Sequence, residues 1–421
     1  MDAVRAALRI DADRLSRDLM GLARIGLNED GSVTRLAFSL AELRARHYMI
    51  HLLQRAGLTV RVDGIGNVIG RIETEGEPAP AVAVGSHIDS VPHGGRFDGA
   101  VGVVAALEVA RVITESKVRL RRPLEVIIFA AEESSRFGVS TIGSSAMAGT
   151  ADPERLLNLT DRNGERLGHI LARFGITRED VAASRRGGGE VGHYLELHIE
   201  QGRVLMEEGK PLGVVRCIAA PCRLKVSFQG QADHSGATPM RLRRDALVAA
   251  ARLVTFVEDI CVVDRAVPVV GTVGVIEAKP GAMNVIPGEA SVWIDLRSTS
   301  ERERTACRDA VLAEAKRLAT ARDLLVSTET LMDDPPVALD PDVCRLLVSV
   351  SAGRGIDYLL MDSGAGHDAM QMAAIARAGL IFVPSREGIS HNPREWTSPS
   401  EIALGAQVLL EATLRLAAHD A

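Results

Sequence analysis

The amino-terminal third of the chain alternates between helical spacing of apolar residues and short continuous apolar runs. Residues 41–57 place apolar side chains three and four positions apart and end at Gly57, as an amphipathic helix with a glycine cap does. Residues 81–85 and 124–131 are continuous apolar runs, which are typical of strands buried on both faces of a sheet. A helix is predicted between them, over residues 99–116. The pattern therefore predicts the strand–helix–strand unit of an α/β domain.

The pattern changes near residue 212. Residues 222–230 form a β-rich segment, and a helix is predicted from about 244 to 258. Two more strand-like runs and a charged helix follow, at 267–278, 291–298 and 301–321. This β-α-β-β-α-β order predicts a compact inserted α+β domain.

After about residue 330 the alternation of apolar strands and helices returns. We therefore expect an α/β fold with a mixed sheet flanked by helices, interrupted by a smaller α+β domain. The expected bounds are 1–212 and 330–421 for the two parts of the first domain and 213–329 for the insertion.

Composition excludes several classes of protein. The 421-residue chain is 46% hydrophobic and 25% charged with a net charge of −6, which is typical of a globular protein and argues against a nucleic-acid partner. No apolar run approaches the length of about 18 residues that a membrane helix needs. Residues 1–26 scatter Asp and Arg among apolar positions, which predicts an amphipathic helix and not a signal peptide. Five cysteines without a CxxC pair favour a reduced, cytoplasmic protein.

The richest polar segment directly follows a predicted buried strand, and the carboxyl ends of parallel strands are where α/β proteins place ligands. This segment holds His87, Asp89, His93 and Asp98. Histidine and carboxylate are ligands of zinc and similar ions, and turn glycines let the backbone fold closely around a site. A polar loop with ordinary surface histidines would also explain this segment by itself.

Three further polar sites follow apolar runs. Glu132 and Glu133 are adjacent carboxyl groups, an arrangement that is unfavourable to bury without a positive charge beside it. His198 lies in a predicted strand, and His391 lies in a loop bounded by Gly and Pro. Solvated acids or a structural histidine would explain each site alone, but four sites at strand ends together favour a metal centre. One acid of the pair would then be a ligand and its neighbour a general base.

Seven motifs occur in one order along nearly the whole chain: GSHIDSVPHGGRFDG, AEESSRFG, ELHIEQG, ADHSGATPM, NVIPGEASVWIDLRS, SGAGHDAM and GISHNPREW. With these motifs the chain resembles the zinc-dependent amidohydrolases that cleave N-carbamoyl amino acids and allantoate, a branch of the dinuclear aminoacylase and carboxypeptidase family. The resemblance implies a hydrolase that splits the carbamoyl C–N bond of N-carbamoyl-L-amino acids, giving amino acid, ammonia and carbon dioxide. Allantoate amidohydrolase and β-ureidopropionase activities are the alternatives, because they use the same dinuclear centre.

The resemblance also implies a role for individual residues. The expected ligands of two divalent ions are His87 and His198, Glu133 and His391, and a bridging Asp98. Glu132 is the expected general base, and Asp89 is expected to accept a hydrogen bond from His87 and fix its tautomer. Zinc is the expected metal, with manganese and cobalt as alternatives. His198 points to an amidohydrolase, because the related peptidases are expected to use a carboxylate at that place.

In similar enzymes, residues of the inserted domain bind the substrate carboxylate and the developing oxyanion. The corresponding residues here are Arg223, His234, Asn284 and Arg297. An arginine fork matches a carboxylate, and a histidine donor can stabilise an oxyanion, although ordinary surface roles are the alternative for Arg297 and His234. The resemblance implies a homodimer in which the insertion is the dimerisation (lid) domain and His234 is donated across the interface. Further residues expected to line the pocket are Gln201, Gly364 and Ala365.

Two other classes of enzyme find no support in the sequence. The glycines of residues 64–70 do not match GxGxxG, a strand is predicted to follow them, and no GxSxG motif of a serine hydrolase is present. The expected substrate is a small molecule with a carboxylate and a ureido group. Its identity stays open, because Ala-Ala-Pro at 219–221 stands where allantoate-cleaving relatives tend to carry a Gly-Gln pair.

Overall fold

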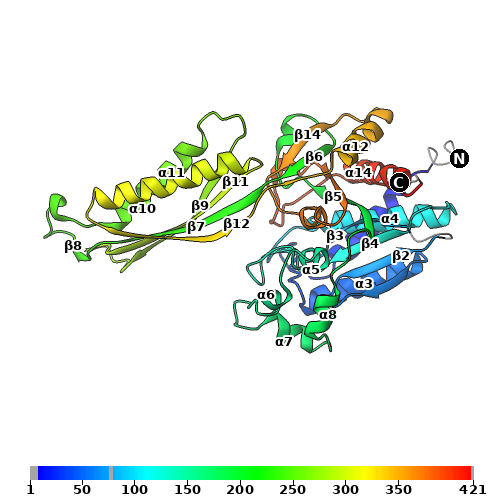
Figure 1. The fold of residues 1–421 in the computed structure, drawn as a ribbon, viewed down its shortest axis with the longest axis horizontal. Coiled ribbons are helices and arrows are strands. Elements are labelled where there is room, and N and C mark those ends of the chain that lie inside the picture. Colours follow the sequence, from blue (N-terminus) through cyan, green and yellow to red (C-terminus); the bar gives the residue numbers. More distant parts are fainter. Residues whose placement is uncertain (1–7, 75–78, 419–421) are drawn as a thin grey trace. The chain divides into compact units, whose positions relative to one another are not determined.

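The computed structural model describes residues 8–74 and 79–418. The chain forms two compact units, one of Met1–Arg216 with Ala338–Ala421 and the other of Cys217–Val337 (Figure 1). The second unit begins and ends later than the insertion expected from the sequence. The reason is that β6 (Gly213–Ile218) pairs with β15 (Arg377–Val383) of the first unit, while β12 (Leu325–Asp333) lengthens the sheet of the second.

The first unit is built on a nine-stranded mixed sheet. Its order is β1 (Thr59–Val62), β2 (Val68–Ile72), β4 (Leu124–Phe129), β3 (Ala81–His87), β5 (Val191–Ile199), β15, β6 and β13 (Val337–Ala338), and β14 (Leu359–Ser363) pairs with β6. The central strands β4, β3, β5 and β15 are parallel, whereas β1, β2 and β6 pair antiparallel. Both β3 and β4 are buried along their whole length, which explains their largely apolar sequence.

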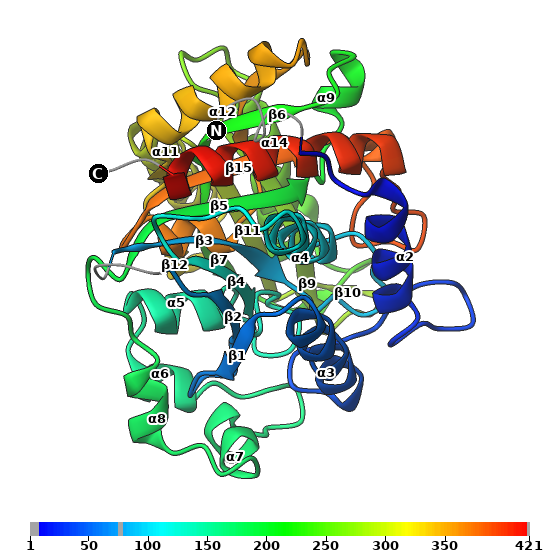
Figure 2. The ribbon, with the colours of Figure 1, turned by 90° about the vertical axis from the view of Figure 1, so that its right-hand side faces the viewer.

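Helices flank this sheet. They are α2 (Ala12–Ala23), α3 (Leu40–Arg55), α4 (Ala100–Glu115), α5 (Ile142–Ala148), α6 (Pro153–Leu157), α7 (Leu167–Ala172), α8 (Arg178–Ala183), α9 (Val204–Glu207), α12 (Pro341–Gly353), α13 (Asp368–Met372) and α14 (Pro399–Ala418), with the 3₁₀ helix η2 (Arg386–Gly388). Helices α4 and α14 pack on each other and on β3 and β5 (Figure 2), while α5 packs on α13, which contacts β5 and β15. The expected α/β fold with a mixed, helix-flanked sheet is confirmed. No helix in the described part of the chain is long and apolar enough to cross a membrane.

Local signals set the ends of the first helices. Ser39 accepts the N–H of Glu42 and caps α3, and Gly57 follows the helix with a φ of 85°. Asp11 accepts the N–H of Arg14 and caps α2. The amphipathic helix expected over residues 1–26 is therefore shorter, and residues 1–7 lie outside the described part of the chain.

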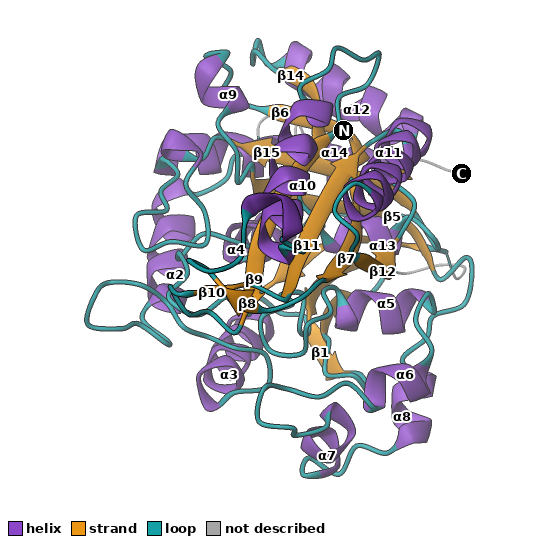
Figure 3. Cartoon of the chain, turned by 90° about the vertical axis from the view of Figure 1, so that its left-hand side faces the viewer, coloured by secondary structure: helices purple, strands orange, loops and turns teal. Residues whose placement is uncertain are grey.

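The second unit has the expected β-α-β-β-α-β order with a small ribbon added. Its elements are β7 (Ala220–Gln229), β8 (Asp233–His234), η1 (Met240–Leu242), α10 (Ala246–Cys261), β9 (Val270–Lys279), β10 (Val285–Ile286), β11 (Glu289–Ser298), α11 (Glu301–Thr320) and β12. The antiparallel sheet has the order β12-β7-β11-β9, and β8 and β10 form a separate two-stranded ribbon. Alternate residues of β7 and β11 are buried beneath α10 and α11, which pack on each other over the sheet (Figure 3).

Candidate metal centre

The parallel strands of the first unit bring polar side chains to one edge of its sheet. His87 is the last residue of β3, and His198 lies near the end of β5. Glu132 follows β4, and His391 lies in the loop after β15. Because these strands are adjacent and parallel, their carboxyl ends meet. Asp98 joins them from the loop before α4.

Asp98 stands between two groups of ligand-type side chains. Its Oδ1 atom is 3.4 Å from His87 Nε2 and 3.2 Å from His198 Nε2. Its Oδ2 atom is 3.2 Å from His391 Nε2, and that nitrogen is 3.3 Å from Glu133 Oε1. One carboxylate thus offers one oxygen to each group. Imidazole nitrogen and carboxylate oxygen are donors that zinc and related ions accept, so the donor set fits two such ions.

Hydrogen bonds decide which ring nitrogen each buried histidine offers. His198 donates from Nδ1 to the backbone oxygen of Ile199 at 2.8 Å, so its Nε2 carries the lone pair, which accepts the N–H of Gly99 at 3.1 Å. His87 Nδ1 is 3.1 Å from the backbone oxygen of Asp89 and 3.6 Å from its carboxylate. Asp89 is therefore the neighbour of His87 that the sequence led us to expect, but its backbone oxygen is the nearer acceptor.

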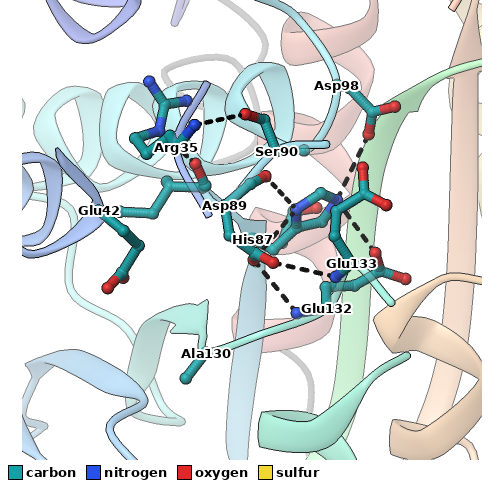
Figure 4. Close-up of polar contacts among 12 residues, drawn as sticks. Arg35, Glu42, His87, Asp89, Ser90, Asp98, Ala130, Glu132 and Glu133 are labelled. Carbon is teal, nitrogen blue, oxygen red and sulfur yellow. Dashed lines mark hydrogen bonds and ion pairs between the residues drawn. The ribbon is translucent and has the colours of Figure 1, made fainter. Parts of the chain in front are cut away.

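The carboxylate of Asp89 holds the turn that carries the acidic pair (Figure 4). Its oxygens accept the N–H groups of Glu132 at 3.1 Å and Glu133 at 3.0 Å. Ala131, just before them, has a φ of 53°, which turns the chain sharply after β4. The fully buried guanidinium of Arg35 donates to the backbone that precedes Asp89. A fixed backbone therefore aims the two acids.

Several buried carboxyl groups gather at this end of the sheet, among them Asp89, Asp98, Glu132, Glu133, Glu196, Asp368 and Glu395. Burial raises the pKa of Glu132 well above its usual range, with His87 opposing and Glu133 reinforcing the shift. Burial also raises the pKa of Asp98, but its histidine contacts outweigh it and hold the pKa well below the usual value. Contacts with Asp98 and Glu133 raise the pKa of His391 to about 11. So many buried acids favour the binding of cations.

A third group of ligand-type residues lies behind His198. The ring of His367 packs edge-on against His198 with 4.6 Å between centroids, and Glu196 lies close to both. The Glu196 carboxylate already accepts the hydroxyl of Ser86 at 2.7 Å and the N–H of Ala369 at 2.9 Å. Both oxygens of Glu196 thus already accept hydrogen bonds, and the His367 ring packs against His198.

The residues expected to line a pocket in the first unit lie beside the cluster. Gln201 has a φ of 59° and donates from Nε2 to Asp98 Oδ2 at 2.6 Å. Gly364 and Ala365 lie in the loop between β14 and His367. Gln201 thus contacts a candidate ligand directly. Gly364 and Ala365 lie three and two residues before the buried His367, whose ring packs against His198.

Two residues differ from what the sequence suggested. His93, grouped with His87 by its spacing, is exposed, and its side chain pairs with Asp30 at 3.0 Å outside both ligand groups. Glu395, which no pattern in the sequence marked, is 2% exposed and accepts the N–H of Asp98 at 3.2 Å. A single acid four positions after a histidine carries no signal of such a contact.

Two of the residues expected in the insertion meet on the ribbon of the second unit. His234 lies in β8, and Asn284 directly precedes β10, with its backbone oxygen accepting the N–H of Ser235 at 3.0 Å. His234 Nδ1 accepts the N–H groups two and three residues further on, both at 3.1 Å. The neutral ring therefore carries its proton on Nε2, in the form of a hydrogen-bond donor.

The other two residues, Arg223 in β7 and Arg297 in β11, lie in the four-stranded sheet, towards the end away from the ribbon. Asp295 lies between them: its Oδ2 accepts from Arg223 Nε at 2.9 Å and its Oδ1 from Arg297 Nε at 2.8 Å. Burial raises the pKa of Asp295, but the two guanidinium groups outweigh it and lower the pKa. Strand β11 runs from Glu289, near the ribbon, to Ser298, and at ~3.3 Å a residue this separates the two pairs by roughly 25 Å. One copy of the second unit does not bring the four residues together.

Comparison with known proteins identifies the family. Residues 83–415 match the model of Peptidase family M20/M25/M40. The chain is 40% identical to the N-carbamoyl-L-amino acid amidohydrolase of Geobacillus stearothermophilus, across 97% of this chain and 99% of that protein. It is 37% identical to the ureidoglycolate hydrolase of Arabidopsis thaliana, across 96% of this chain and 86% of that protein. The crystal structure of an amidase of the hydantoinase/carbamoylase family from Burkholderia multivorans superposes with a TM-score of 0.90, at 36% identity, covering 99% of this chain and 100% of that one.

The chain therefore belongs to Peptidase family M20/M25/M40. This confirms the family resemblance read from the seven motifs. The similarity to proteins named amidohydrolase and amidase covers almost the whole chain and both of its units.

Proposed function

We propose that this protein is a metal-dependent amidohydrolase that cleaves the carbamoyl group from N-carbamoyl-L-amino acids. In the reaction, water and the ureido group give the free amino acid, ammonia and carbon dioxide. The observation that carries the proposal is the arrangement of Asp98 between two ligand groups, with the buried Glu132 beside them: Glu132 Oε2 is 3.7 Å from His87 Nε2.

His87, His198 and Asp98 hold one ion in this proposal, and Asp98, Glu133 and His391 hold the other. When bound, two such ions supply Lewis acidity and lower the pKa of water so that hydroxide forms near neutral pH. We propose zinc as the metal, because histidine and carboxylate donors suit it; manganese and cobalt are the alternatives.

Glu132 is the general base of the proposed reaction. It takes a proton from the attacking water and passes this proton to the leaving nitrogen. Its position supports this role, since Asp89 fixes its backbone N–H and its carboxyl group lies beside His87 of the proposed ligand set.

The second unit supplies the contacts to the rest of the substrate. Arg297 and Asn284 bind the carboxylate, with Arg223 beside Arg297, and the Nε2–H of His234 stabilises the oxyanion. Because the ribbon pair and the arginine pair lie roughly 25 Å apart in one copy, a single site draws them from different copies. We therefore propose a homodimer in which the second unit is the dimerisation domain and His234 acts on the partner's substrate.

A cytoplasmic location accompanies this proposal. Its support is the chemistry of the cysteines: the five are described by the structure, and none of them forms a disulfide there.

Release of ammonia from a panel of substrates tests the function. The panel holds several N-carbamoyl-L-amino acids, their D-forms, N-carbamoyl-β-alanine, allantoate and ureidoglycolate. Each is assayed with added zinc, manganese or cobalt and again after chelation. The proposal expects chelator-sensitive turnover of the L-carbamoyl compounds and little turnover of the D-forms.

Other outcomes of this panel point elsewhere. Turnover of allantoate, ureidoglycolate or N-carbamoyl-β-alanine alone would keep the metal centre and replace the substrate. Absence of turnover by protein with two bound ions would show that the substrate class is wrong.

A further inference from the structure

Glu395 joins two chain segments that carry candidate metal ligands. Its Oε1 accepts the N–H groups of Phe97 at 2.8 Å and Asp98 at 3.2 Å. Its Oε2 accepts the hydroxyl of Ser390 at 2.8 Å. One buried carboxylate therefore holds the backbone of Asp98 and the residue directly before His391.

The chain closes tightly around this carboxylate. A Cβ atom at Gly95 would lie 2.0 Å from Glu395 Oε1, so a larger residue at that position would have to displace the carboxylate. The ring of Phe97 packs edge-on against that of Trp396 with 5.5 Å between centroids. The contact between the loop 95–98 and the loop 390–396 is thus both apolar and hydrogen-bonded, with Glu395 inside it.

Ser390 extends this link to the side chain of Asp98. Its Oγ is 3.1 Å from Asp98 Oδ2 and 2.8 Å from Glu395 Oε2. Oδ2 is the oxygen that faces His391, whereas Oδ1 faces His87. The contacts of Glu395 therefore act mainly on the side of Asp98 that faces Glu133 and His391.

We propose that Glu395 is a positioning residue of the metal centre, which sets Asp98 and His391 for the ion on the Glu133 side. The inference rests on the proposed function and adds to it a residue outside the ligand set. Glu395 acts through Asp98 and His391. The ion on the Glu133 side has two ligands that depend on Glu395, namely Asp98 and His391. The ion on the His87 side has one, Asp98. Loss of Glu395 therefore weakens metal binding more at the Glu133 side than at the His87 side.

Metal titration of the full-length protein tests this inference. The protein is freed of metal by chelation and titrated with Zn²⁺ by calorimetry, and with Co²⁺ by visible absorbance. Wild type is expected to bind two ions per subunit. In Glu395→Ala, one binding step should weaken about 10- to 100-fold, the usual effect of removing a group that supports metal ligands, while the other step stays within a few-fold. In the Co²⁺ titration of Glu395→Ala, the absorbance change of one binding step should differ from that of wild type, and the change of the other step should match it.

Two milder variants guard against misfolding of Glu395→Ala. Glu395→Gln keeps an oxygen for the two N–H groups and should restore much of the weakened step. Ser390→Ala removes the hydroxyl alone and should weaken the same step by a smaller factor. A matched control is Glu401→Ala, which removes a carboxylate that bonds Ser398 at the start of α14, and it should leave both steps unchanged.

The outcomes separate this inference from the proposed function. Two unchanged steps in a folded Glu395→Ala or Ser390→Ala variant would overturn the role of Glu395. If both binding steps weaken equally in Glu395→Ala, and Glu401→Ala weakens them as much, Glu395 has only a general structural role. That outcome would also overturn the proposed positioning role. A wild-type protein that binds no ions would overturn the proposed function itself.

Discussion

The two units of this protein hold their candidate functional residues in opposite ways. In the first unit the ligand-type side chains are mostly buried, and their ligand atoms lie within 4.8 Å of one another in two groups that share Asp98. In the second unit His234 and Asn284 are exposed on a short ribbon, and Arg223 and Arg297 lie roughly 25 Å away along the sheet.

The contrast separates metal binding, for which one chain holds all the candidate ligands, from the proposed substrate contacts, for which one second unit does not bring the residues together. The parallel sheet assembles the candidate metal centre at its own strand ends, and the Asp89 carboxylate, which accepts two backbone N–H groups, holds the turn that carries Glu132 and Glu133. In the proposed function, the two residue pairs of the second unit are half-sites that a second copy completes. On that proposal the first unit is preorganised for chemistry while the second depends on assembly.

The largest expected effect is the loss of the base within the preorganised unit. Glu132→Gln keeps the size and the backbone contacts of the side chain but cannot accept the proton, so turnover should fall by about 100-fold or more. Zn²⁺ content measured by atomic spectrometry should stay at the wild-type level. Exposed Glu208→Gln is the control and should keep wild-type turnover. Activity near wild type in Glu132→Gln would remove Glu132 from the mechanism.

Mixing two inactive variants tests whether the second unit really completes its site across copies. Glu132→Gln and His234→Ala are each expected to be inactive, but a mixed dimer places both changes in one site and leaves the other intact. Random pairing in equal amounts should restore about a quarter of wild-type activity, as symmetry requires of a dimer with shared sites. Activity is measured after unfolding and refolding the variants together, and after refolding them separately. If the mixture stays as inactive as the separate variants, His234 serves its own chain or none.

The sequence predicted the first unit well because its signals are local. Buried strands appear as apolar runs, and the candidate sites follow such runs, so the strand–helix–strand unit and the chemistry could be inferred together. The motifs then identified the family, which the comparisons confirm. His93 shows the limit of spacing: it lies close to His87 in sequence but on an exposed turn with Asp30.

Contacts between distant segments could not be predicted in the same way. Glu395 contacts Asp98 across almost 300 positions, and nothing in either segment announces the pairing. Asp295 lies between two arginines because antiparallel register sets Arg223 opposite it, and register follows from the assembled sheet. The separation of His234 from Arg297 is likewise a consequence of strand length and direction.

A smaller effect is expected from loosening the backbone beneath the metal centre. Asp89→Asn replaces one acceptor oxygen by an NH₂ group, which then faces the N–H of Glu132 or Glu133 and repels it. Zn²⁺ affinity by calorimetry should fall about 10- to 100-fold. Asp245→Asn in the second unit, where Asp245 caps α10, is the matched control and should leave affinity unchanged. An equal loss in both variants would contradict the idea that preorganisation is confined to the first unit.

The smallest expected effect concerns the arginine pair of the second unit. Arg297→Lys keeps the positive charge but loses the planar fork, so KM for the preferred carbamoyl substrate should rise about tenfold while kcat changes little. Asp295→Asn should raise KM by less, because Arg297 keeps its charge and loses only the carboxylate that orients its Nε. Zn²⁺ affinity should be unchanged in both variants, since Asp295 and Arg297 belong to the second unit and the ligand groups to the first. A fall in kcat with unchanged KM would instead place Arg297 at the ureido group of the substrate. The substrate carboxylate would then need another partner.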